Sequence, residues 1–267
     1  MQYKIGDIAD IFQISKEMIR YYEKQGVISS VRRSDNNYRM YSIWDIFSFL
    51  DFLQYKEMGI SAREVAKIKE CEFSQNMQEQ LSRRKQELDK EILYKQSMRT
   101  RIDEILERME CYKYNEQNYW VKRIEGRYMF HFLSAENDAY GEIDMPLSVR
   151  KQIFSDCLMP MLDPCVEFQE HNEWWYSISQ KYDFLLDDTC KKAARYLPSD
   201  ICLCTVVNMG EIGGFTTECL SPVLAYMREK GYERKGNITG ILLGRGMEKE
   251  EYTRRMEIQI PLKINKN

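Results

Sequence analysis

The chain lacks several features that would define its class. Its 267 residues include only 2 His and 6 Pro, and no Ser-His-Asp constellation accompanies His131 or His171, so nucleophilic catalysis has little support. Its composition excludes a disordered or collagen-like chain. No stretch approaches the roughly 18 apolar residues of a membrane span, and the charged N-terminus does not resemble a signal peptide. We therefore expect a cytoplasmic protein with no membrane segment.

The eight cysteines contain no C-x-x-C pair and are spread along the chain. A disulfide framework is typical of small secreted domains, so we expect reduced and mostly buried thiols. Cys202 and Cys204 alternate in an apolar run, where a metal site is possible but two core residues are more common. We expect neither a metal nor a cofactor.

The charge is nearly balanced, with 39 basic and 42 acidic residues. The total gives no reason to expect a polyanionic partner, but its distribution is uneven. Between residues 16 and 39 there are six basic and three acidic residues. Such a local patch can supply phosphate contacts.

Three regions differ in pattern. Residues 1–72 alternate short amphipathic helices with turns, 75–117 form a long polar helix without Gly or Pro, and 118–267 carry strand-like runs. We predict an α+β chain with a small head, a connector helix and a larger mixed domain.

Apolar residues in the connector recur every seven positions, which is typical of a coiled coil. A heptad repeat has two apolar positions that form the seam between helices. One is occupied by Leu81, Leu88, Ile102 and Met109, and part of the other by Ile92 and Leu106. An exposed helix of this length needs a partner, so we expect an antiparallel homodimer; folding back on its own domain is the alternative.

Two short helices joined by a tight turn are predicted at the N-terminus. Ile5, Ile8 and Phe12 form one apolar face, and Ser15 is placed to cap a second helix after Gln13-Ile14. A polar turn then separates two short runs between Arg32 and Tyr41, as in a hairpin wing.

These residues resemble the MerR family of transcription regulators. The match runs from the Ser-capped helix and Arg20-Tyr21-Tyr22-Glu23, through the wing, to residues 53–65, which look like the family's second helical pair. The resemblance implies a winged helix-turn-helix that binds double-stranded promoter DNA. Two positions depart from it: Asn37 replaces the wing Gly, and Glu17 stands where relatives often have a basic residue.

The resemblance indicates which side chains meet DNA. We predict contacts from the second helix and from the wing, most of them to phosphates, while Glu17 can accept a hydrogen bond from a cytosine amino group. For Tyr22 and Tyr41, both a contact with DNA and a place in the core of the head remain possible. The predicted DNA-binding set is Lys16, Glu17, Arg20, Tyr21, Arg32, Tyr38 and Arg39.

The C-terminal region shows a strand-helix-strand-strand pattern twice. The first copy has strands at 119–124, 127–133 and 173–179 with a helix at 147–162; the second has a strand at 201–208, a helix at 214–230 and strands at 238–244 and 252–262. With its closing run Met256 to Leu262, this region resembles the GyrI-like effector-binding domains of multidrug-sensing regulators.

In these domains an acid lies in the ligand pocket, and the position corresponds to Glu257 here. A partly buried carboxylate attracts a cationic ligand, and aromatic walls bind its flat body. Strand alternation must also point one ring of Trp174-Trp175-Tyr176 away from the core. The predicted ligand-binding set is Glu257, Trp174, Trp175, Tyr128, Tyr140 and Tyr252.

We therefore expect a ligand-responsive transcription activator rather than an enzyme. The resemblance implies a palindromic operator, an effector that distorts promoter DNA, and RNA polymerase as a partner. Two alternatives remain: an architectural DNA-binding protein with a degenerate sensor, and a small-molecule hydrolase that uses Glu257 as a general base.

Overall fold

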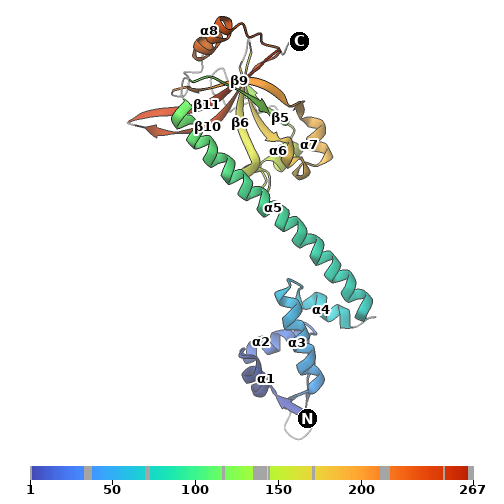
Figure 1. The fold of residues 1–267 in the computed structure, drawn as a ribbon. Helices are drawn as coiled ribbons and strands as arrows, with labels where there is room; N and C mark the ends of the chain where they lie inside the picture. Colours follow the sequence, from blue (N-terminus) through green and yellow to red (C-terminus); the bar gives the residue numbers. More distant parts are fainter. Residues whose placement is uncertain are drawn as a thin grey trace. The chain divides into compact units, whose positions relative to one another are not determined.

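The computed structural model describes residues 2–32, 38–69, 73–115, 118–134, 143, 145–169, 172–210, 217–248 and 250–263. They form two compact units, Met1–Leu93 and Tyr94–Asn267, each of which is described by itself. Figure 1 labels the elements along the chain. Within the described ranges, no helix is long and apolar enough to cross a membrane.

The head begins with the predicted pair of helices. Helix α1 spans Ile5–Phe12 and ends at Gln13, whose left-handed backbone (φ 53°) makes the turn. Helix α2 spans Lys16–Lys24, and the Ser15 hydroxyl accepts a hydrogen bond of 3.1 Å from the Met18 amide. The predicted N-cap of the second helix is confirmed.

A small antiparallel sheet forms the wing. Strands β2 (Val31–Arg32) and β3 (Arg39–Ser42) pair as predicted, and β1 (Gln2–Lys4) joins on the other side of β3. The wing turn, including Asn37, lies outside the described residues. The head core contains Ile8, Ile19, Phe49 and Phe52.

The head also contains two further helices, α3 (Ile43–Glu57) and α4 (Ala62–Lys69). Gly59, between them, has a φ of 90°, a conformation that glycine adopts without strain. The Ser61 hydroxyl accepts a hydrogen bond from the Glu64 amide at 3.3 Å and so caps α4.

Asp45 joins three segments of the head. Its carboxylate accepts hydrogen bonds from the Ser42 amide at 2.8 Å and the Ser29 amide at 3.1 Å. Burial disfavours its charge, but these bonds from Ser42 and Ser29 hold the pKa of Asp45 below its ordinary value. The carboxylate therefore stabilises the head at neutral pH.

Replacing Asp45 by alanine should cost about 1–2 kcal/mol of unfolding free energy, because a cap and two amide partners are removed. Urea unfolding would measure this cost. Asp51→Ala, at an exposed position of the same helix, is the matched control and should change stability by less than about 0.5 kcal/mol. Equal effects of the two substitutions would contradict the assignment.

The connector is one helix, α5, spanning Phe73–Asn115, close to the predicted 75–117. It is long because it contains neither Gly nor Pro, and opposite charges face each other along it, as in Arg84 with Glu87 and Glu91. In the C-terminal unit, Tyr94 and Met98 pack against the core of that unit. Met98 therefore does not extend the exposed apolar stripe.

The C-terminal unit is an eight-stranded sheet in the order β4-β9-β11-β10-β6-β7-β5-β8. The first half contains β5 (Arg127–Ser134), α6 (Leu147–Ile153), β6 (Leu162–Phe168) and β7 (Glu173–Ser179). The second contains β9 (Asp200–Asn208), α8 (Ser221–Lys230), β10 (Ile238–Glu248) and β11 (Glu251–Pro261). The predicted strand-helix-strand-strand pattern occurs twice, and β6 and β10 pair at the centre.

Several boundaries differ from the prediction. The helix predicted at 147–162 ends at Ile153, and Leu162 already begins β6 after a short 3-10 turn (Met159–Met161). Helix α8 begins at Ser221 after a 3-10 turn at Thr217–Leu220. The edge strands are β4 (Trp120–Ile124) and β8 (Arg195–Leu197), which follows η2 (Gln180–Leu185) and α7 (Asp188–Ala193).

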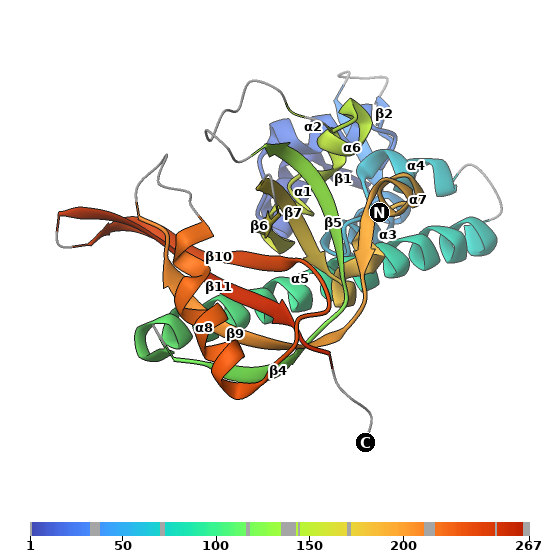
Figure 2. The same ribbon diagram turned by 90° about the horizontal axis from the view of Figure 1, so that it is seen from above.

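Helices cover one face of this sheet and form the main core with it. In Figure 2, α6 lies beside the half that contains β5 to β7, and α8 beside the other half. Val149 and Ile153 of α6 and Val223 and Met227 of α8 are buried in the core cluster that contains Ile258. Since side chains alternate along a strand, the opposite face remains for a site.

Candidate functional site

The outer face of α2 carries the side chains predicted to meet DNA. Lys16, Glu17, Arg20 and Tyr21 are all exposed, while Ile19 between them is buried in the head core. Arg20 and Glu17 form an exposed ion pair at 3.6 Å. The helix therefore presents polar and cationic groups outward, as a recognition helix requires.

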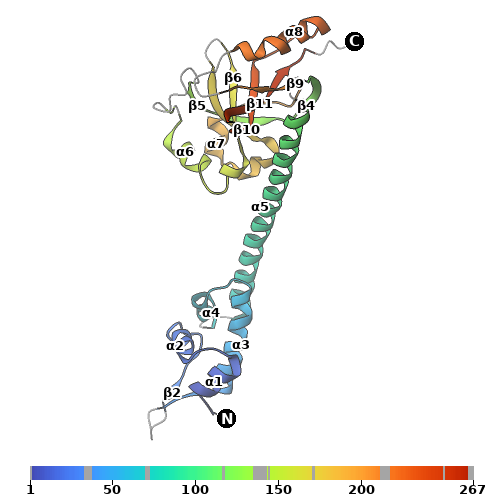
Figure 3. The same cartoon turned by 90° about the vertical axis from the view of Figure 1, so that its left-hand side faces the viewer.

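The wing is attached to α2 by Glu23. Its carboxylate contacts the Arg39 guanidinium at 3.1 Å and accepts a hydrogen bond from the Ser30 hydroxyl. Arg32 and Tyr38 are exposed beside this contact, and Figure 3 shows α2 and β2 in the head. Glu23 thus positions the wing and recognition helix relative to each other.

The structure places Tyr22 and Tyr41, whose roles the sequence left open, in the core of the head. Tyr22 packs against Phe52, with ring centroids 4.6 Å apart, and Tyr41 is buried next to the same core. Both are core aromatics of the head. Consequently Tyr21 and Tyr38 are the tyrosines of this face that are exposed.

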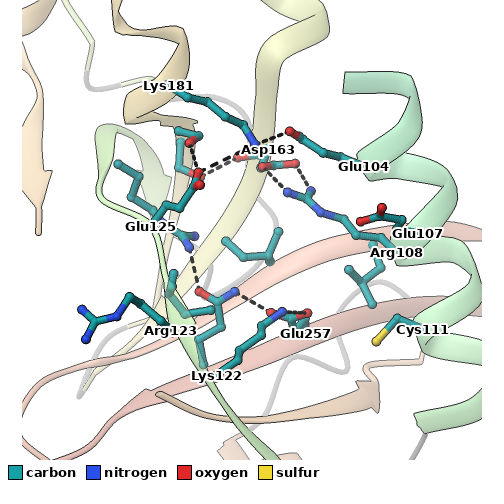
Figure 4. A pocket seen from close by; sticks show the side chains of 17 residues that line it. Glu104, Glu107, Arg108, Cys111, Lys122, Arg123, Glu125, Asp163, Lys181 and Glu257 are labelled. Carbon is teal, nitrogen blue, oxygen red and sulfur yellow. Dashed lines mark hydrogen bonds and ion pairs between the residues drawn. The ribbon is translucent and has the colours of Figure 1, made fainter. Parts of the chain in front are cut away.

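A cavity of about 380 Å³ lies in the C-terminal unit, between the end of α5 and the open face of the sheet (Figure 4). Its lining includes five basic and five acidic side chains and no aromatic ring among the described residues. The charged lining residues are Arg108, Lys122, Arg123, Arg127, Lys181, Glu104, Glu107, Glu125, Asp163 and Glu257.

Asp163 of β6 fixes α5 to the sheet. It is 8% exposed and contacts Arg101 at 2.5 Å, and it also forms an ion pair with Arg108. Burial alone would raise the pKa of Asp163, but Arg108 and Arg101 hold it below its ordinary value. The two arginines lie on the same face of α5 and together neutralise this carboxylate.

Glu104, between those arginines, is also paired. It accepts a hydrogen bond from the Tyr182 hydroxyl at 2.9 Å, lies 3.2 Å from Arg101 and forms an ion pair with Lys181. Burial opposes its charge, yet Lys181 and Tyr182 keep the pKa of Glu104 lowered. This wall of the cavity is therefore a closed network of ion pairs.

Glu257 of β11 lies on the opposite side of the cavity and is 5% exposed. The Lys122 ammonium contacts its carboxylate at 2.8 Å, and the Gln259 amide donates to it at 2.6 Å. Arg127 in turn donates to the Gln259 carbonyl oxygen at 2.9 Å. Side chains alternate along β11: Glu257 and Gln259 share this face, while Met256 and Ile258 are in the core.

The structure does not bring the predicted aromatic residues to this cavity. Trp174 is 9% exposed in the main core, Tyr128 packs on Tyr196, and Tyr252 is half-buried opposite Met247. Tyr140 lies outside the described residues. Of the predicted ligand set, Glu257 alone among the described residues lines the cavity.

Strand alternation explains the two tryptophans. In β7, Trp174 joins Ile178 on the helix-covered face, whereas Trp175 shares the open face with Ser177 and Ser179, which line the cavity. Trp175 does point away from the main core, as predicted, but the Arg195 guanidinium lies over its ring at 4.2 Å.

Cys202 and Cys204 are both buried, on the face of β9 opposite to Leu203 of the main core. Burial raises the pKa of Cys202 to about 11 and that of Cys204 still further, so both stay protonated at neutral pH. The described part of the chain contains no cluster of three His, Cys, Asp or Glu residues arranged to hold a metal ion.

Most of the charged residues that line the cavity were not predicted from the sequence. Arg101, Glu104 and Arg108 are three and four residues apart, a spacing that places them on one helical face. Asp163 is a carboxylate within an apolar strand run, where a charge requires a partner. These two signals together point to a buried ion-pair cluster.

Comparisons with known proteins concern mainly the head. A mercuric resistance operon regulatory protein of Bacillus cereus is 35% identical over 68 residues, which are 26% of this chain and 52% of that protein. A heavy metal-dependent transcription regulator 2 of Rhizobium meliloti (strain 1021) is 30% identical over 64 residues, 24% of this chain and 44% of the relative. The chain thus spans about half the length of these relatives.

Among solved structures, the cryo-EM structure of an EcmrR-DNA complex covers 97% of this chain and 99% of its own. Its TM-score of 0.37 and 16% identity are too low to support any argument about function. The family comparison is more specific, because the family described as MerR family regulatory protein matches residues 4–41, the helix pair and wing. Residues 4–41 of this chain are therefore similar to the MerR family regulatory proteins.

Proposed function

We propose that the chain is a ligand-responsive, DNA-binding transcription regulator. The observation that carries the proposal is the exposed cationic face of α2 and the wing, within the region that matches the MerR family. Helix α2 enters the major groove, while Arg32 and Arg39 of the wing meet the backbone. Such a protein acts in the compartment that holds the DNA.

A mobility-shift and footprinting assay on the DNA upstream of the chain's own gene tests this proposal. We expect specific protection of a palindromic site, in keeping with two heads related by a dimer axis. Equal binding to scrambled DNA at all salt concentrations would contradict it.

We further propose that α5 forms an antiparallel coiled coil between two chains. Its apolar seam positions are exposed, including Ile102 at 51% and Leu106 at 55%. Exposed apolar residues repeating on one face of a helix need a partner surface.

Leu106→Glu combined with Ile102→Glu should convert the dimer to a monomer, because four buried charges would face each other across the seam. Light scattering after gel filtration would measure the mass. Thr100→Glu, at an exposed polar position of α5, is the control and should remain dimeric. A wild-type chain that is monomeric at micromolar concentration would exclude this interface.

The C-terminal unit is proposed to be a GyrI-like effector domain. Its duplicated strand-helix-strand-strand order and the cavity beside Glu257 support this assignment. An effector in the cavity contacts both α5 and the sheet, so it can shift the dimer between conformations that hold promoter DNA differently for RNA polymerase. We assign ligand binding, and not catalysis, to this cavity.

Transcription from the footprinted promoter, with and without candidate effectors, separates this proposal from a purely architectural role. We expect a cavity ligand to change transcript yield. If every compound that binds the C-terminal unit leaves transcription unchanged, the architectural role replaces effector sensing.

A further inference from the structure

The cavity's carboxylates are already neutralised by the protein itself. Glu257 contacts Lys122 at 2.8 Å, Asp163 contacts Arg101 at 2.5 Å, and Glu125 lies 3.7 Å from Lys181. Glu104 is paired with Lys181 as well. Only Glu107, exposed on α5, lines the cavity without an ion pair among the described residues. A cationic ligand would therefore have to displace Lys122 to reach Glu257.

Among the described residues, two basic side chains of the lining form no ion pair, the exposed Arg123 and Arg127. Arg127 is half-buried, and its hydrogen-bond partner among the described residues is the neutral amide of Gln259. A guanidinium has five N–H donors in a planar fork, so most of its donors remain available. Among the described residues, the group is a charge without a counter-ion, beside a space large enough for a small molecule.

The surroundings of Arg127 suit an anionic group. Arg127 is directly opposite Ser179 across the β5–β7 pair, and Ser177 and Ser179 both line the cavity. The Ser179 hydroxyl donates to Glu125 at 2.9 Å and the Ser177 hydroxyl to the Asp163 carbonyl oxygen at 3.4 Å. The available donors are therefore those of Arg127, and a guanidinium binds a carboxylate or a phosphate through two parallel hydrogen bonds. Within the described ranges, the lining offers no aromatic wall for a flat hydrophobic body.

We propose that the cavity binds a small polar molecule through a carboxylate or phosphate group held by Arg127. The inference rests on the effector role proposed above, refines it, and replaces the cationic aromatic ligand expected from sequence. A volume of about 380 Å³ matches a small polar metabolite. Gln259 then connects ligand binding at Arg127 to Glu257 and Lys122.

Titration calorimetry of the full chain tests this inference, with citrate and inorganic phosphate as anionic probes and tetraphenylphosphonium as a lipophilic cation. Sodium chloride keeps the ionic strength constant. We expect saturable binding of citrate or phosphate, and whichever binds more tightly distinguishes the carboxylate from the phosphate. Binding of the cation without either anion, or no anion binding, would overturn the inference.

Arg127→Gln should weaken anion binding at least about tenfold, and Arg127→Lys should weaken it less because the charge is kept. Arg228→Gln is the matched control, because Arg228 is exposed on α8 and does not line the cavity. The control should change the dissociation constant only slightly. Thermal unfolding and circular dichroism would verify that each variant is folded. Equal losses of affinity in the position 127 and 228 variants would contradict a specific site.

Operator binding separates this inference from the proposed function. If the wild-type chain shifts operator DNA but binds neither anion, the regulator assignment stands and the ligand class is wrong. If anions bind through Arg127 while no DNA site is found, the ligand class stands and the regulator assignment fails.

Discussion

Replacing Arg20 by alanine should weaken binding to the operator by roughly ten- to a hundredfold, since truncating a side chain that reads the groove costs about 1–3 kcal/mol. Arg20 is exposed on α2, and its ion-pair partner Glu17 lies on the same outer face at 3.6 Å. A bond from Arg20 to DNA would therefore replace only a weak, solvent-exposed pair. Fluorescence anisotropy with labelled operator DNA at several salt concentrations would measure the change.

Lys16→Ala distinguishes a phosphate contact from a base contact. If Lys16 meets phosphate, affinity should fall on specific and nonspecific DNA alike, and the salt dependence should decrease by about one counter-ion. Lys90→Ala removes one charge from an exposed position of α5 and is the control. Unchanged affinity in both the Arg20 and Lys16 variants would show that α2 is not the recognition helix.

The second large effect is expected at Asp163. Replacing it by alanine should cost about 3–5 kcal/mol of unfolding free energy, because Arg108 and the buried Arg101 would both lose their ion pair with this carboxylate, and Arg101 would keep only Glu104. The same change should loosen the end of α5 from the sheet of the C-terminal unit. Urea unfolding would measure stability, and hydrogen exchange would report on the helix. Asp156→Ala, at an exposed acid, is the control and should leave both readouts near wild type.

The contribution of Asp163 depends on pH in a direction fixed by its lowered pKa. The stabilisation is complete above the unfolded-state pKa of about 4 and is lost as the pH falls through the lower folded-state pKa. The alanine variant should therefore lose less stability than wild type as the pH falls from about 5 to about 2. Parallel acid-unfolding curves would contradict a charged, ion-paired Asp163.

The sequence by itself determined the local features of this chain. The Ser15 cap, the turn at Gln13, the wing strands and the long α5 all depend on residues close together in sequence, so periodicity and capping rules locate them. The family resemblance of residues 4–41 is local in the same sense. The doubled pattern was predictable only in part: β6 was not predicted as a strand, and its first residue, Leu162, was assigned to a predicted helix because its apolar run has no distinctive period.

Only the tertiary structure decided the chemistry of the cavity. Glu257 meets Lys122 across 135 residues, and Asp163 meets Arg101 across 62. The strand order that creates the first of these pairs places β4 and β11 on either side of β9. Periodicity assigns a residue to a face but does not say which distant strand becomes its neighbour, and so it does not reveal which charges cancel. For that physical reason the sequence predicted an unpaired acid at Glu257, whereas the fold neutralises it and leaves Arg127 available.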